Sequence, residues 1–111
     1  MAHKVTLIPG DGIGPEVAEA AQRAVEATGV NIDWQVVELS ADIMEKTGTE
    51  LPEYVLESIR STKVALKGPV TTPIAGGFKS VNVSLRKQLD LFANVRPVRR
   101  LPGIKTRYMD V

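Results

Sequence analysis

The sequence alternates short apolar runs with segments of helical periodicity, and this alternation restricts the fold of the 111 residues more than any other feature. Strands that alternate with helices in this way are typical of an α/β fold. We therefore expect a largely parallel sheet flanked by helices and joined by right-handed crossovers. In chain order the pattern predicts a strand at 3–8, a helix at 16–28, a strand at 31–39, helices at 41–47 and from Pro52, a strand at 63–67, a helix from Ser80 and a final strand that ends at Pro97.

Apolar positions within these elements predict which side chains form the core. The helix at 16–28 should bury one stripe, the strand at 31–39 should bury alternate residues, and the helix from Pro52 should turn three apolar side chains inward. The expected core residues are Val17, Ala21, Ala24, Val25 and Thr28 in the first helix, Ile32, Trp34 and Val36 in the strand, and Val55, Leu56 and Ile59 in the later helix.

Two loops follow the ends of predicted strands, and ligands bind at the carboxyl ends of strands in sheets of this kind. The loops run over residues 10–14 and 68–80, and we expect them to border one cleft. The first reads Gly10-Asp11-Gly12-Ile13-Gly14, and its alternating glycines do not match the Gly-x-Gly-x-x-Gly spacing of a dinucleotide fingerprint. It is therefore either a tight strand-to-helix turn or a loop beside the cleft, and the sequence leaves both possibilities open.

Composition limits the class of protein. Hydrophobic residues make up 43% of the chain and charged residues 24%, a balance typical of a soluble globular protein with one small domain. The absence of cysteine excludes disulfides and thiolate metal sites within this sequence. No apolar run approaches the roughly 20 residues of a membrane span, and the amino-terminal residues lead directly into a strand. We expect a cytoplasmic protein with no membrane partner.

Charge is distributed unevenly along the chain. Residues 1–78 carry 6 Lys or Arg against 11 Asp or Glu, a net charge of −5, whereas residues 79–111 carry 8 against 2, a net charge of +6. The cationic third is either a solvated surface that balances the acidic helices or a binding surface for anions. It lacks the interleaved aromatic residues of a nucleic-acid site, so we expect no nucleic-acid partner.

A site for a small polycarboxylate is predicted around the helix that begins at Ser80. The unpaired amides of a helix start attract negative charge, and Ser80 is placed as the N-cap. Asn82 and Arg86 share one helix face because they are four residues apart, and Arg96 could return a second guanidinium to the same place. The periodicity that predicts this helix comes from Val81, Leu85 and Leu89.

The same stretch resembles a known family. The series Ser80-x-Asn82-x-x-x-Arg86, Leu89-Asp90-Leu91 and Ala93-Asn94-x-Arg96-Pro97 is similar to the substrate segment of the isocitrate dehydrogenase branch of the β-decarboxylating dehydrogenases. The similarity runs from Lys4 to about Val98. In the related isopropylmalate dehydrogenases the positions of Ser80 and Asn82 are usually apolar, so the polar pair favours isocitrate. The resemblance implies that residues 1–111 are the N-terminal portion of an isopropylmalate dehydrogenase-like domain whose remainder lies outside this chain.

The resemblance also assigns roles to individual residues. Ser80 and Asn82 would bond the carboxylates of the substrate, while Arg86 and Arg96 would clamp them. The residues that it places on the cofactor side are Thr71, Thr72 and Asn94, with Lys67 nearby. From the residue types alone, the two threonines could equally make turn hydrogen bonds, and the asparagine could be a polar residue at a strand edge.

The implied activity is the oxidative decarboxylation of isocitrate to 2-oxoglutarate, a reaction of the tricarboxylic acid cycle. It would use NAD or NADP, with NAD favoured, together with Mg or Mn, in a homodimer or larger oligomer. The tyrosine, lysine and aspartates that the family uses for proton transfer and metal binding have no match in these 111 residues. We therefore assign no catalytic residue and no metal ligand to the chain, and we expect it to be inactive alone.

Two classes of function follow. In the first, the chain is the N-terminal part of an isocitrate dehydrogenase. In the second, it is a complete short protein that binds a polycarboxylate or docks as a non-catalytic, regulatory subunit on a full-length homologue. The end of the sequence favours the first class, because Asp110-Val111 resembles the opening of another strand rather than a polar tail.

Overall fold

A computed structural model describes residues 1–73, 77–99, 101–105 and 107. The expected strand opening at Asp110-Val111 lies outside these residues. The described elements are β1 (His3–Ile8), α1 (Gly14–Glu26), β2 (Ile32–Val36), α2 (Ala41–Thr47), α3 (Glu53–Thr62), β3 (Ala65–Lys67) and α4 (Val81–Gln88). Their order confirms the predicted alternation of strands and helices as far as α4.

The three strands form a parallel sheet in the order β2-β1-β3, as predicted. His3 pairs with Ile32 at one side of β1, and Thr6 pairs with Ala65 at the other. The strand that comes first in the sequence is therefore the central strand of the sheet. Its last four residues are buried, because both its edges are paired and both its faces are covered.

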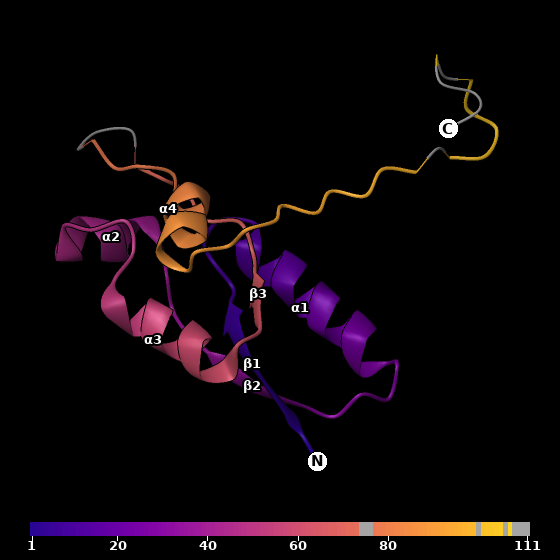
Figure 1. The fold of residues 1–111 in the computed structure, drawn as a ribbon, viewed down its shortest axis with the longest axis horizontal. Coiled ribbons are helices and arrows are strands. Elements are labelled where there is room, and N and C mark those ends of the chain that lie inside the picture. The colour runs from indigo at the N-terminus through magenta and orange to yellow at the C-terminus, as the bar shows by residue number, and fades with distance from the viewer. Residues whose placement is uncertain (74–76, 100, 106, 108–111) are drawn as a thin grey trace.

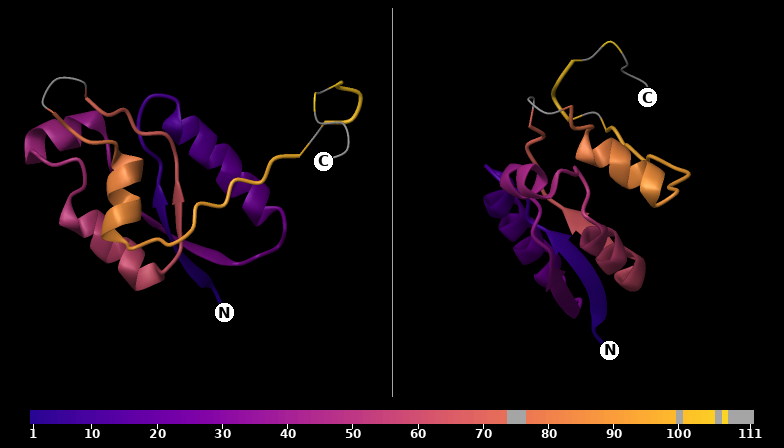
Figure 2. Two further views of the ribbon diagram at one scale, coloured as in Figure 1. Left: turned by 45° about the horizontal axis from the view of Figure 1, so that its top comes forward. Right: turned by 90° about the vertical axis from the view of Figure 1, so that its left-hand side faces the viewer.

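Helices cover both faces of the sheet (Figures 1 and 2). On one side lies α1, whose Ala18 is buried. On the other side α2, α3 and α4 pack around Ile8, which is fully buried. The core on that side also contains Leu39, Met44, Leu51, Val55, Leu56, Val81 and Leu85.

A buried polar contact ties β1 to α3. The hydroxyl of Thr6 is fully buried, and its Oγ1 lies 2.8 Å from Ser58 Oγ and 2.8 Å from Thr62 Oγ1. Hydroxyls can both donate and accept, so the three groups satisfy one another without water. This cluster fixes α3 against the centre of the sheet.

Helices α2 and α3 match the sequence prediction closely. Ser40 caps α2 by accepting a hydrogen bond at Oγ from the Ile43 amide (3.3 Å), and Gly48 ends the helix with φ of +70°. Pro52 precedes the first residue of α3, and the expected inward residues Val55 and Leu56 are buried. Residues at the helix ends, such as the cap and the terminating glycine, therefore determine the bounds of these two helices.

Part of the predicted core is wrong. Val17 and Ala24 in α1 are exposed, Thr28 lies beyond the end of α1 and is exposed too, and in β2 Val36 is 61% exposed. The other expected residues of these elements, Trp34 among them, are only half-buried, and Trp34 Nε1 donates to Glu26 Oε1 (3.0 Å). For β2 the reason is that it is an edge strand, so few described residues can pack beyond it.

The predicted final strand is also not formed. Residues 91–99 have no regular structure and are exposed, and the chain runs away from α4 over this stretch (Figure 1). The apolar side chains that suggested a strand remain in solvent: Phe92 is 102% exposed and Val98 96% exposed. A strand requires a hydrogen-bonding neighbour, and no strand of the described chain pairs with this segment.

Candidate functional site

Three loops meet at the carboxyl edge of the sheet, where parallel strands all end. The loop after β1 contacts the loop after β3 through the Asp11 amide, which donates to the Pro69 carbonyl (3.2 Å). The Gly68 amide donates to the Ile8 carbonyl (2.8 Å) and continues the pairing of the two strands. The two loops are therefore in contact within the described residues, and a cleft that both of them border stays a prediction.

Glycines allow these two loops to approach so closely. A Cβ atom on Gly10 would lie 1.8 Å from the Pro69 carbonyl oxygen, and one on Gly68 would lie 2.2 Å from the Pro9 carbonyl oxygen. Gly12 differs, because its φ is +58° and no atom lies within 4 Å of the position of its Cβ. Gly12 supports the first alternative, a tight turn between strand and helix, and Gly10 permits close contact with the loop after β3. The second alternative, a loop beside the cofactor cleft, stays a prediction.

Asp11 joins all three loops through its carboxylate. Oδ1 accepts a hydrogen bond from the Thr71 amide (2.8 Å), and Oδ2 accepts one from the Ala41 amide at the first residue of α2 (2.8 Å). Burial acts to raise the pKa of Asp11, but the hydrogen bonds from Ala41 and Thr71 and the charge of Lys67 outweigh it and hold the pKa below its ordinary value. Sequence reasoning missed this residue; the only signal was an acidic side chain between two glycines after a strand.

Lys67 ends β3 beside this cluster. It is half-buried, and its ammonium donates to the Gly68 carbonyl (2.9 Å). Burial lowers the pKa of Lys67, and the negative charge of Asp11 opposes that shift. The Lys67 ammonium is thus held at the edge of the sheet where the loops meet.

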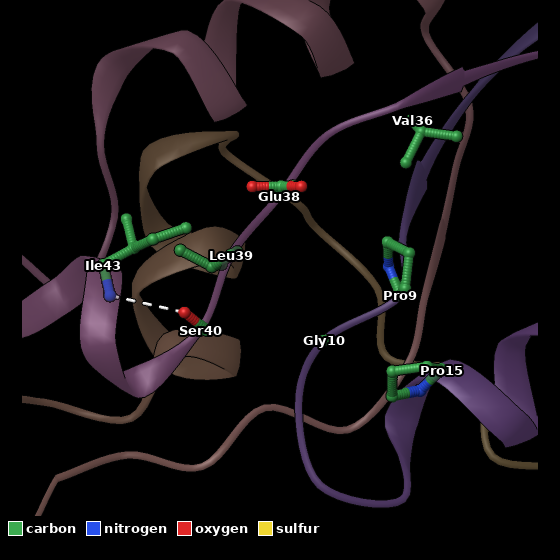
Figure 3. Close-up of a pocket in the computed structure, with 8 residues that line it drawn as sticks. All are labelled: Pro9, Gly10, Pro15, Val36, Glu38, Leu39, Ser40 and Ile43. Atoms are coloured by element: carbon green, nitrogen blue, oxygen red, sulfur yellow. Dashed lines mark hydrogen bonds between the residues drawn. The ribbon is translucent and has the colours of Figure 1, made fainter.

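A cavity of about 310 Å³ lies between the first loop and the segment that leads into α2 (Figure 3). Its walls are mainly apolar, and Glu38 and Ser40 supply the polar side chains. None of the predicted site residues contributes to these walls. The lining residues are Pro9, Gly10, Pro15, Val36, Glu38, Leu39, Ser40 and Ile43.

Helix α4 carries three of the predicted site residues. Ser80 is the N-cap, as expected; its side chain makes no capping hydrogen bond, and its carbonyl accepts from the Val83 and Ser84 amides at 3.0 Å each. Asn82 is exposed and Arg86 is partly exposed, because the opposite face of the helix is buried in the core. The serine hydroxyl, the amide and the guanidinium are all on the accessible part of the helix.

Polar contacts hold α4 at its middle and at its carboxyl end. The buried Ser84 hydroxyl donates to Glu50 Oε1 (2.8 Å), and Arg60 Nη2 donates to the Gln88 carbonyl (3.5 Å). The backbone amide of Glu50 itself, the Ser84 hydroxyl and the charge of Lys79 together lower the pKa of Glu50. No sequence pattern indicated this contact, because Glu50 lies in the turn between α2 and α3.

The remaining predicted residues are distributed differently. Thr71 is exposed and tied to Asp11, and Thr72 is half-buried in the same loop. Asn94 and Arg96 lie in the exposed segment beyond α4, where Arg96 Nε donates to Asn94 Oδ1 (3.4 Å). An approach of Arg96 to Arg86 remains a prediction.

Two kinds of feature are missing from the part of the chain that the structure describes. Residues 1–73, 77–99, 101–105 and 107 contain no group of three or more His, Cys, Asp or Glu side chains that could hold a metal ion. Over the same ranges no helix has the length and apolar character needed to cross a membrane.

Comparison with known proteins identifies the class to which this sheet and its loops belong. The family model for isocitrate/isopropylmalate dehydrogenase matches residues 4–109, and the chain belongs to that family. A mitochondrial isocitrate dehydrogenase [NAD] catalytic subunit 5 of Arabidopsis thaliana is 51% identical over 96% of this chain and 28% of its own length. A chloroplastic 3-isopropylmalate dehydrogenase of Solanum tuberosum is 48% identical over 97% of this chain and 30% of its own length.

A solved structure supports the same assignment. The crystal structure of isocitrate dehydrogenase from Methylococcus capsulatus matches with a TM-score of 0.72 and 51% identity, over 81% of this chain and 26% of that chain. The chain thus spans less than a third of the length of these relatives. The parallel sheet flanked by helices is part of the fold of this family, as the sequence predicted.

Proposed function

We propose that this chain forms the N-terminal portion of an isocitrate dehydrogenase and binds the carboxylates of isocitrate at the start of α4. The observation that carries the proposal is the arrangement of Ser80, Asn82 and Arg86 on the accessible part of a helix whose other face is anchored in the core. A helix start attracts anions, and the guanidinium can bind a carboxylate with two parallel hydrogen bonds. The relatives named isocitrate dehydrogenase support isocitrate as the substrate.

Arg96 would provide the second clamp, and Thr71, Thr72 and Asn94 would face the nicotinamide cofactor. The exposure of Thr71, Asn94 and Arg96 leaves them available for such contacts. NAD or NADP supplies hydride acceptance when it is bound. The name of the Arabidopsis relative specifies NAD, which supports NAD as the cofactor of this protein.

Residues of this chain would orient the substrate and would not perform the chemistry. The described residues offer no ligand set for Mg or Mn, so the metal would be held by residues other than these. We also propose a homodimer or larger oligomer. A location in the cytoplasm and a role in the tricarboxylic acid cycle remain predictions from the sequence.

The test is an assay of the full-length protein that carries these residues. We expect reduction of NAD or NADP that depends on isocitrate and on Mg or Mn. A charge-assisted hydrogen bond is worth roughly 1.5–3 kcal/mol, so Arg86→Gln should lower kcat/KM by about ten- to a few-hundredfold.

Lys87→Gln is the matched control, because it removes the same charge from the neighbouring, exposed position of α4. It should leave kcat/KM within about twofold of the parent, as expected for an exposed charge that contacts no substrate. Equal losses in the two variants would contradict a specific role for Arg86. Activity with 3-isopropylmalate in place of isocitrate would overturn the choice of substrate.

A further inference from the structure

Asp11 binds the loops at the carboxyl edge of the sheet from two sides. Its main-chain amide donates to Pro69, and its side chain accepts from the amide of Thr71, two residues further along. The second carboxylate oxygen is occupied by the Ala41 amide. One residue thus connects the loop after β1 to segments 30 and 60 positions away in the sequence.

From these contacts we propose that Asp11 is a positioning residue that holds Thr71 and Thr72 in place, and thereby sets the efficiency of the reaction without touching the substrate. The inference rests on the proposed function, in which the two threonines face the cofactor. It concerns a residue that the sequence pattern did not assign to the site.

A carboxylate is required at this position because two separate amides point at it. Asparagine has a single side-chain oxygen, and its NH2 group would face an amide that is itself a donor. One of the two contacts must therefore be lost in Asp11→Asn. The flanking loop cannot shift to compensate, since Gly10 already lies against the Pro69 carbonyl.

The contact to Thr71 is the one expected to fail. Ala41 begins a helix that Ser40 caps and that Met44 anchors in the core, so the Ala41 amide is fixed independently of Asp11. Thr71 is exposed, and its amide is held by the Asp11 carboxylate. Loss of that bond would release the threonines from the edge of the sheet.

The test compares Asp11→Asn with Thr6→Val in the full-length protein. Thr6→Val removes two buried hydrogen bonds from β1 to α3 but touches neither loop, so it controls for loss of stability. Hydrogen exchange at the amide of Thr71 reports on the loop directly. Steady-state kinetics with isocitrate and NAD(P) report on how release of the loop changes catalysis.

In Asp11→Asn we expect exchange at Thr71 to accelerate and kcat/KM to fall, each by about tenfold, with the kinetic loss mainly in KM for the cofactor. Thr6→Val should reduce thermal stability at least as much but leave both quantities within about twofold, because its partners lie in α3. Unchanged exchange at Thr71 in Asp11→Asn would overturn the inference. So would an equal loss of kcat/KM in Thr6→Val.

The same experiment separates this inference from the proposed function. If the parent protein shows no isocitrate-dependent reduction of NAD or NADP, the proposed function fails. The exchange comparison then still decides whether Asp11 holds the loop of Thr71.

Discussion

Gly68→Ala tests whether close contact between two loops builds the carboxyl edge of the sheet. The added Cβ would lie 2.2 Å from the Pro9 carbonyl oxygen, 3.0 Å from the Pro9 carbonyl carbon and 3.2 Å from the Gly14 carbonyl oxygen. All three are backbone atoms, so no side-chain rotation can relieve the clash. The loops would have to separate by about 1 Å, and such overpacking typically costs 1–3 kcal/mol.

Separation of the loops should also weaken the hydrogen bond from the Asp11 amide to the Pro69 carbonyl, and this loss raises the cost of the substitution by about 1 kcal/mol. We therefore expect the free energy of unfolding to fall by about 2–4 kcal/mol in urea denaturation of the full-length protein. Gly12→Ala is the matched control, because it has a φ of +58° but nothing within 4 Å of its Cβ position. It should cost only about 1 kcal/mol for the left-handed backbone.

The two variants separate packing from backbone strain. If Gly68→Ala is no more destabilising than Gly12→Ala, the close approach of the loops does not contribute to stability. The interpretation of the glycines as sites of loop contact would then be wrong.

Four further outcomes are expected. The pKa of Asp11 in the folded protein is lowered from 3.8, so the stability that the carboxylate adds relative to Asp11→Asn should be complete above pH 3.8. This stability should be lost as the pH falls through the folded-state pKa. A difference in urea midpoint between the two proteins that persists in strong acid would contradict this. Leu56→Ala should cost about 2–5 kcal/mol in chemical denaturation, because Leu56 is 1% exposed. Ser84→Ala should raise the pKa of Glu50 toward 4.5 in an NMR titration and cost about 1 kcal/mol, and an unchanged pKa would exclude the contact. Ser80→Asp should maintain or raise the melting temperature, since aspartate is a good N-cap, yet increase KM for isocitrate at least about tenfold by charge repulsion; an unaltered KM would refute carboxylate binding there.

The fold was predictable where local signals define an element. Gly48 adopts the left-handed backbone that ends α2, and Pro52 precedes the first turn of α3, so both helices were predicted nearly to the residue. The final strand was not predictable in the same way. Its apolar residues fit a strand, but pairing depends on a neighbour that the described chain does not provide, and Phe92 and Val95 are exposed.

The meeting of the two loops was predictable from the sequence, but the hydrogen bonds between them were not. Parallel strands bring their following loops to one edge, so the meeting of residues 10–14 with residues 68–80 followed from the predicted sheet. The hydrogen bonds of Asp11 to Ala41 and Thr71 did not follow, because sequence periodicity carries no information on contacts between residues so far apart. The anchoring of α4 by Glu50 is hidden for the same reason.

The central position of β1 has a consequence for synthesis of the protein. Its first partner arrives 29 residues later, as His3 pairs with Ile32, and its second arrives 59 residues later, as Thr6 pairs with Ala65. At roughly 5–20 residues per second, translation leaves β1 without its second neighbour for about 3–12 s. During that interval the apolar run of Val5, Leu7 and Ile8 is available to other nascent chains and to chaperones, so the central strand of this sheet stays incompletely paired until β3 is made.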